Sequence, residues 1–119
     1  MRKFLPLAAL AAVALAPAAP AFAHAHVVSS NPATNAVIAA PRAISVTFTE
    51  KLVPAFSKLD VAMSGMDMKV PVKTSVSADG RTLTGVPQGK FVKGNYVVNW
   101  TAASADGHKM KGSIPFKIK

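Results

Sequence analysis

Short stretches in which apolar and polar residues alternate recur along most of this chain. The clearest spans residues 43–49, where Ile44, Val46 and Phe48 would face one side and the intervening Ser and Thr residues the other. Alternation with period two is typical of a half-buried β-strand. Six further segments fit the same expectation, at residues 26–30, 59–63, 70–75, 81–86, 96–102 and 114–118.

Turn-forming residues separate these segments, and no stretch after residue 23 has the periodicity of an amphipathic helix. The turn signals are Asp79-Gly80, Gly94-Asn95, Pro32, Pro41, Pro54 and Pro87. About seven short strands at this spacing predict an all-β fold, a small antiparallel Greek-key sandwich or barrel of the immunoglobulin-like class. We expect its core to be formed by the inward-facing residues around Ile44, Leu59, Tyr96 and Ile114, with Trp100 near the centre.

The first 23 residues do not follow this pattern and read as an export signal peptide. Arg2 and Lys3 come before an apolar run at residues 5–15, and the small-x-small sequence Ala-Phe-Ala at residues 21–23 marks a cleavage site. A transmembrane anchor needs about 20 apolar residues, whereas prolines interrupt this run after roughly a dozen. We therefore predict cleavage before His24, a folded domain at residues 24–119, and a periplasmic location.

The amino-acid composition excludes several classes of function. The chain has 119 residues, 14 Lys and Arg against 5 Asp and Glu, and no Cys. Cleavage would leave 96 residues with a net charge of +7, enough for one ordinary hydrophobic core without disulfides. The basic residues are scattered singly without interleaved aromatic residues, which argues against nucleic-acid binding. No paired-carboxylate, Ser-His-Asp or phosphate-loop pattern is present, so we expect a protein that is not an enzyme.

All three histidines occupy positions that suit metal binding. Cleavage would make His24 the first residue, whose α-amine and imidazole can chelate one cation. Asp106 and His108 follow the aromatic strand with Gly107 between them, and an extended chain would point both side chains the same way. An amine, two imidazoles and a carboxylate form a tetragonal set that favours Cu(II), and the absence of Cys argues against structural zinc or blue copper. His26 is either a further ligand or a neighbour of the site.

Two other copper arrangements remain open. In the first, a free terminus with His26 at the third position wraps the metal with the amine, two backbone amides and that imidazole, leaving Asp106 and His108 unused. In the second, the thioethers of Met63, Met66 and Met68 hold Cu(I), which soft sulfur ligands select. Met is also a common core residue, and Met63 continues an apolar strand face.

The combination of these motifs resembles the CopC family of periplasmic copper-resistance proteins, including its YobA-like members. The motifs are His24-Ala25-His26, Ser30-Asn31-Pro32-Ala33, Phe48-Thr49-Glu50, the Met segment, the Gly94–Trp100 stretch, Asp106-Gly107-His108 and Gly112-Ser113. The resemblance implies a Greek-key β fold and Cu(II) bound by His24, Asp106 and His108, with Glu50 close to the copper as a ligand or as a group that orients one. Because the Met segment has no His, the chain looks closer to members that hold Cu(II) alone.

The resemblance also implies a role in copper resistance, storage or transfer. The expected acceptor is an inner-membrane copper transporter of the CopD type or another periplasmic copper protein, and the expected state is a monomer. Two alternatives come from other classes. One is a metal-free immunoglobulin-like interaction module, and the other is an oxidative copper enzyme that uses a histidine brace.

Overall fold

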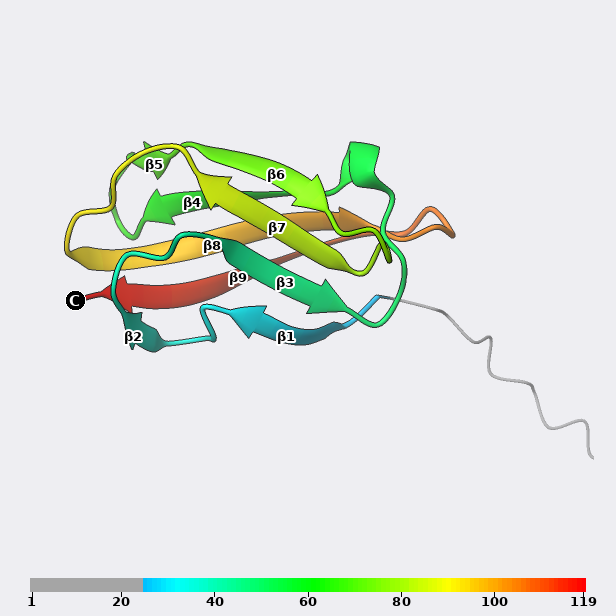
Figure 1. The fold of residues 1–119 in the computed structure, drawn as a ribbon, viewed down its shortest axis with the longest axis horizontal. Helices are drawn as coiled ribbons and strands as arrows, with labels where there is room; N and C mark the ends of the chain where they lie inside the picture. The colour runs from blue at the N-terminus through cyan, green and yellow to red at the C-terminus, as the bar shows by residue number, and fades with distance from the viewer. Residues whose placement is uncertain (1–24) are drawn as a thin grey trace, which may run out of the picture.

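The chain folds as two β-sheets packed face to face (Figure 1). Each sheet turns the buried residues of its strands toward the other. The structure is a computed structural model that describes residues 25–119. Its strands are β1 Val27–Asn31, β2 Ala36–Ile38, β3 Ile44–Phe48, β4 Lys58–Met63, β5 Lys69–Val70, β6 Val72–Val76, β7 Thr82–Pro87, β8 Gly94–Ala103 and β9 Lys109–Ile118. Within residues 25–119 the one helical element is a short 3₁₀ turn, η1 (Pro54–Phe56), and no helix is long and apolar enough to cross a membrane.

The predicted all-β sandwich is confirmed, and its strands divide between two sheets. One sheet has the order β1-β3-β7-β6 and the other has the order β2-β9-β8-β4-β5. Every pairing is antiparallel except that of β2 with β9. The longest pairing joins β8 to β9 over ten residue pairs, from Gly94 opposite Ile118 to Ala103 opposite Lys109. This long hairpin reaches from one end of the sandwich to the other.

Two features of the strand prediction need correction. The segment 70–75 was expected to be one strand, but it is split at Pro71 between β5 in the five-stranded sheet and β6 in the other. Proline lacks the N–H that would continue the ladder, so the chain changes sheets there. The second feature is β2, whose three residues are too few to show an alternation in the sequence. Residues 25–119 therefore form nine strands where the sequence indicated about seven.

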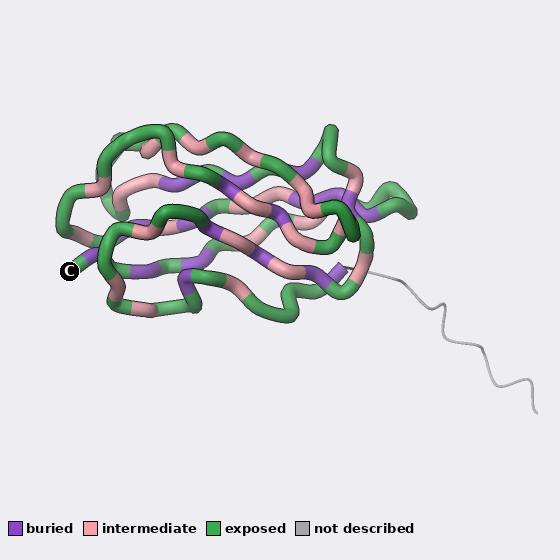
Figure 2. The backbone as a smooth tube through the Cα atoms, in the orientation of Figure 1, coloured by how far each residue is buried: buried purple, intermediate pink, exposed green. Residues whose placement is uncertain are grey.

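The core lies between the sheets and is built by the residues that alternation predicted. In β3, Ile44, Val46 and Phe48 are buried while the two residues between them are partly exposed. Figure 2 shows the same succession of buried and more exposed positions along the other central strands. Tyr96 is fully buried, and its hydroxyl donates to the Val92 carbonyl oxygen at 2.7 Å.

Trp100 faces the core but lies toward its margin, because the residue is only partly buried. Its ring meets Phe48 edge-on, with 5.0 Å between the ring centroids. On the neighbouring strand Gly112 lies directly opposite Trp100, and a Cβ placed there would be 2.5 Å from Trp100 Cζ2. The indole therefore occupies space that only a glycine leaves open.

Candidate metal centre

The β8–β9 hairpin turn brings Asp106 and His108 together. Asp106 Oδ2 lies 2.9 Å from His108 Nδ1, and Asp106 Oδ1 accepts the backbone N–H of His108 at 3.1 Å. The Ser104 hydroxyl donates to the same Oδ1. The pair was expected to meet across an extended chain. Instead the chain turns tightly here, with Gly107 at φ +91°, and the side chain of Asp106 folds back over the turn.

Hydrogen bonds keep Asp106 in its charged form. The pKa of this carboxyl lies well below its ordinary value because the Ser104 hydroxyl donates to it, followed in importance by the His108 side chain and the His108 backbone N–H. The side chains of His108 and Asp106 are 48% and 36% exposed, so both remain accessible from solvent. The turn thus presents an anionic oxygen and an imidazole nitrogen side by side at the surface.

The first described residues of the chain are fastened to the same end of the sandwich. Ala25 is buried in the core. His26 N–H donates to Thr49 Oγ1 at 2.9 Å, and Thr49 N–H donates to the His26 carbonyl oxygen at 2.9 Å. His24, the predicted terminal ligand, lies outside the described residues together with the predicted signal peptide. The described chain thus begins beside Thr49, which directly precedes Glu50 in the loop after β3.

Backbone contacts also join the Glu50 loop to the base of the hairpin. Leu52 forms a β-bridge with Ser104, and Val53 N–H donates to the Ala103 carbonyl oxygen at 2.8 Å. Three segments far apart in sequence therefore meet at one end: the start of the domain, the loop after β3, and the β8–β9 turn. In Figure 1 this is the right-hand end.

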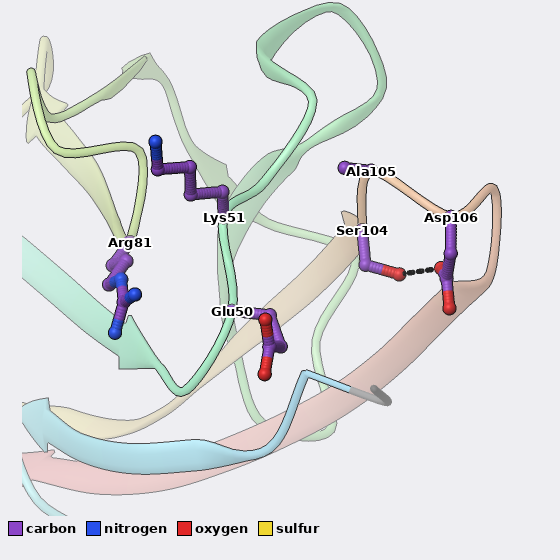
Figure 3. Close-up of a pocket in the computed structure, with 6 residues that line it drawn as sticks. All are labelled: Glu50, Lys51, Arg81, Ser104, Ala105 and Asp106. Atoms are coloured by element: carbon purple, nitrogen blue, oxygen red, sulfur yellow. Dashed lines mark hydrogen bonds between the residues drawn. The ribbon is translucent and has the colours of Figure 1, made fainter. Parts of the chain in front are cut away.

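Beside the turn lies a surface cavity of about 380 Å³. Its lining residues, drawn in Figure 3, are Glu50, Lys51, Arg81, Ser104, Ala105 and Asp106. Glu50 therefore shares the cavity with Asp106. Sequence reasoning gave no role to Ser104, Lys51 or Arg81. No local pattern marks Lys51 and Arg81, because they lie about 55 and 25 residues before Asp106 in the chain. Ser104 lies two residues before Asp106, and its role comes from the hydrogen bond across the turn.

Within residues 25–119, no three His, Asp or Glu side chains gather closely enough to hold a metal ion by themselves. Asp106 and His108 form a pair, and the third predicted ligand, His24, lies outside that range. His26 is exposed, and its backbone N–H is bonded to Thr49. The arrangement that wraps a metal with the terminal amides would have to break this hydrogen bond.

The three clustered methionines lie at the opposite end of the sandwich from Asp106. β4 runs antiparallel to β8, so Met63 pairs with Tyr96 while Lys58 pairs with Thr101, nearer the hairpin turn. Met63 packs against the core, whereas Met66 and Met68 are 57% and 55% exposed. Met110 is partly buried against the core as well.

The CopC domain model matches residues 27–119. This chain belongs to the CopC family. It is 42% identical over 107 residues to Copper resistance protein C of Xanthomonas campestris pv. juglandis, a match that covers 85% of this chain and 84% of the relative. The fold matches the crystal structure of PcoC, a methionine-rich copper resistance protein from Escherichia coli, with a TM-score of 0.74 and 34% identity. That match covers 82% of this chain and all of PcoC.

A longer relative contains a segment of the same kind. Copper transport protein CutJ of Bacillus subtilis (strain 168) is 35% identical to this chain over 99 residues. The match covers 82% of this chain but 18% of CutJ. A CopC-like segment is thus a small part of that copper transport protein.

Proposed function

We propose that this chain is an exported copper-binding protein without catalytic activity, which holds one Cu(II) at the end of the sandwich formed by the domain start and the β8–β9 turn. Residues 1–23 are its signal peptide and residues 24–119 its mature periplasmic domain. Membership of the CopC family and the similarity to copper resistance proteins support a role in copper handling. The observation that carries the assignment of the site is the Asp106–His108 pair beside the anchored chain start.

The spacing of the pair suits two neighbouring ligands of one copper ion. Two atoms bound to a first-row metal at about 2.0 Å and at right angles lie about 2.8 Å apart. Asp106 Oδ2 and His108 Nδ1 are 2.9 Å apart. Each carboxylate oxygen has two lone pairs, so Asp106 can bind a metal while it keeps its hydrogen bonds from Ser104 and the His108 backbone.

The mature terminus supplies the remaining ligands in this proposal. The α-amine and imidazole of His24 complete a set of three nitrogens and one oxygen, which favours Cu(II) in a tetragonal geometry. Glu50, in the same cavity, accepts a hydrogen bond from a bound amine, imidazole or water rather than binding the metal itself. His26 is not a ligand. No Cu(I) site is proposed at Met63, Met66 and Met68, since Met63 packs against the core.

We further propose that the protein is a monomer that passes its copper to an acceptor. An inner-membrane transporter of the CopD type fits this role, and the CopC-like segment within the CutJ copper transport protein supports such a pairing. Another periplasmic copper protein is the alternative acceptor. Copper transfer between this protein and a purified candidate acceptor, followed by copper analysis after separation, tests the pairing.

Titration with Cu(II) tests the site. Protein that begins at His24, confirmed by mass spectrometry, should bind one equivalent with the electron paramagnetic resonance spectrum of a nitrogen-rich tetragonal centre. One extra Gly before His24 should weaken binding sharply, and so should His108→Ala. His26→Ala is the matched control, because it removes an imidazole two residues from the terminus without touching the proposed ligands.

Three results would count against this assignment. Equal affinity with and without the extra Gly would overturn the terminal-amine ligand. Unchanged Cu(II) affinity in Asp106→Ala and His108→Ala would exclude both residues as ligands, as the terminal-amide arrangement or a metal-free interaction module requires. Copper-dependent peroxide formation or polysaccharide oxidation by the loaded protein would favour the oxidative enzyme.

A further inference from the structure

The cavity beside Asp106 carries two positive side chains, Lys51 and Arg81, along one side, which we call the cationic wall. A site for a bare metal cation does not need such charges. Figure 3 shows Lys51 and Arg81 on one side of this cavity, Asp106 on the other and Glu50 between them. Lys51 directly follows Glu50 in the loop after β3, and Arg81 directly precedes β7. Two positive side chains therefore share a hollow with the carboxylate of the proposed copper site.

Backbone hydrogen bonds fix the loop that carries Lys51 and the turn that carries Arg81. The Arg81 carbonyl oxygen accepts the Phe48 N–H at 2.8 Å, and Leu52 N–H donates to the Gly80 carbonyl oxygen at 2.8 Å. Asp79 Oδ1 accepts the Arg81 N–H at 3.1 Å and the Ser77 hydroxyl at 2.5 Å, which fixes the turn before Arg81. The backbone positions from which these two side chains extend are thus fixed by the fold.

These charges do not neutralise one another. Among residues 25–119, Glu50, Lys51 and Arg81 line one cavity without reaching ion-pair distance of one another. A cavity lined by charges of both signs complements a ligand that carries both signs. Lys51 and Arg81 would repel bare Cu(II), whereas they would attract a copper complex whose outer groups are carboxylates.

We propose that this cavity admits Cu(II) as an anionic chelate with a small polycarboxylate, and that Lys51 and Arg81 bind the outward-facing carboxylates of that chelate. This inference rests on the proposed copper site and names the form in which copper reaches it. Lys51 and Arg81 orient the complex so that its metal faces Asp106 and His108. Arg binds carboxylates through two parallel N–H groups, which gives that contact a defined geometry.

The exchange leaves copper in the +2 state throughout. One bond from copper to the chelator or to a bound water breaks as each copper–protein bond forms, and the proton of the α-amine of His24 is released to solvent when that nitrogen binds. The freed chelator leaves as a carboxylate anion from the cationic wall. Nothing is oxidised or reduced, so no further reactant is needed.

Three copper donors of different charge test this inference. The donors are Cu(II)–nitrilotriacetate with net charge −1, Cu(II)–iminodiacetate with net charge zero, and aqueous Cu(II) in a non-coordinating buffer. Stopped-flow absorbance of the protein-bound copper gives the second-order rate constant of loading for each donor. The variant Lys51→Gln/Arg81→Gln is compared with Lys69→Gln/Lys90→Gln, which removes the same charge near the opposite end of the sandwich.

The expected pattern depends on the charge of the donor. In water, one unit charge about 7 Å from another changes the encounter rate roughly threefold. Losing both cations should therefore slow loading from Cu(II)–nitrilotriacetate about sevenfold at low salt. Loading from Cu(II)–iminodiacetate should be unchanged, and loading from aqueous Cu(II) should be faster, because two charges that repel it are gone. The far-end control should match the wild type with all three donors, and the effect should shrink as salt is added.

Two different failures can be told apart. If the Lys51→Gln/Arg81→Gln variant slows all three donors equally, or behaves like the far-end control, the cationic wall has no role in chelate capture and the inference is overturned. The copper site itself would stand in that case. If the wild-type protein takes up copper from none of the donors, aqueous Cu(II) included, both the inference and the proposed function are wrong.

Discussion

Substitution of Gly112 by Ala tests the packing of the hairpin that carries the proposed site. A Cβ at position 112 would lie 2.5, 2.6 and 2.8 Å from Cζ2, Cε2 and Nε1 of Trp100, closer than real Cβ atoms approach such atoms. The indole must therefore move away from β9. Any such movement also disturbs its edge-on contact with Phe48, where the ring centroids are 5.0 Å apart.

The expected loss of stability follows from these two effects. Overpacking a filled core costs about 1–3 kcal/mol, and a lost aromatic pair costs about 0.5–1.5 kcal/mol. We expect Gly112→Ala to lower the free energy of unfolding by about 2 kcal/mol, and the melting temperature by roughly 8–16 °C for a domain of this size.

Urea denaturation followed by tryptophan fluorescence is a direct assay, because Trp100 is the single Trp of the chain. The emission of the folded variant should shift to longer wavelength as the displaced indole meets water. Lys111→Ala, on the exposed side of the same strand, is the control and should change stability by less than 0.5 kcal/mol in either direction. A Gly112→Ala protein with wild-type stability and emission would refute the packing argument.

Three further predictions concern the site and the two ends of the sandwich. Asp106→Asn should weaken Cu(II) binding at least 10- to 100-fold by titration. Because hydrogen bonds lower the pKa of Asp106 in the folded state, its contribution to stability is complete above the ordinary value of 3.8 and is lost as the pH falls further. The difference in unfolding free energy between wild type and Asp106→Asn should therefore shrink as the pH falls below 3.8 in acid titrations followed by fluorescence. Tyr96→Phe should cost about 1–3 kcal/mol in urea denaturation, since it removes the hydroxyl that donates to the Val92 carbonyl and accepts the Val92 N–H. Met66→Ser/Met68→Ser should leave one Cu(II) bound per protein in the same titration, because both side chains lie at the end of the sandwich away from Asp106; a lost equivalent would contradict that separation.

The strands whose buried residues alternate with exposed ones could be predicted from the sequence. The alternation of Ile44, Val46 and Phe48 was enough to place β3 and its buried face, because a residue's side of the sheet follows from its parity. The division at Pro71 could not be anticipated in the same way. The sequence shows that a proline interrupts the pattern, but which sheet each half joins depends on partners far along the chain.

The candidate site shows the same limit. The pairing of Asp106 with His108 was predictable because the two residues are near neighbours, although a turn rather than an extended chain brings them together. Glu50 entered only through a family resemblance. The proximity of Lys51 and Arg81 to Asp106 could not be predicted, because hydrogen bonds between loops and turns distant in sequence produce it. The spacing of residues in the sequence does not indicate such contacts.

The anchoring of the domain start has a consequence for how the protein is prepared and processed. Ala25 is buried and His26 is hydrogen-bonded to Thr49 on both its N–H and carbonyl sides, so the sandwich holds these residues whatever precedes them. A chain cut one residue early, or expressed with an added Met, should fold and melt like the properly processed form. In the proposed site it would nevertheless lack the amine on His24. Batches of equal purity and stability could then differ in the amount of copper that they bind. The fraction of molecules able to bind Cu(II) at this site would equal the fraction that the signal peptidase cuts directly before His24.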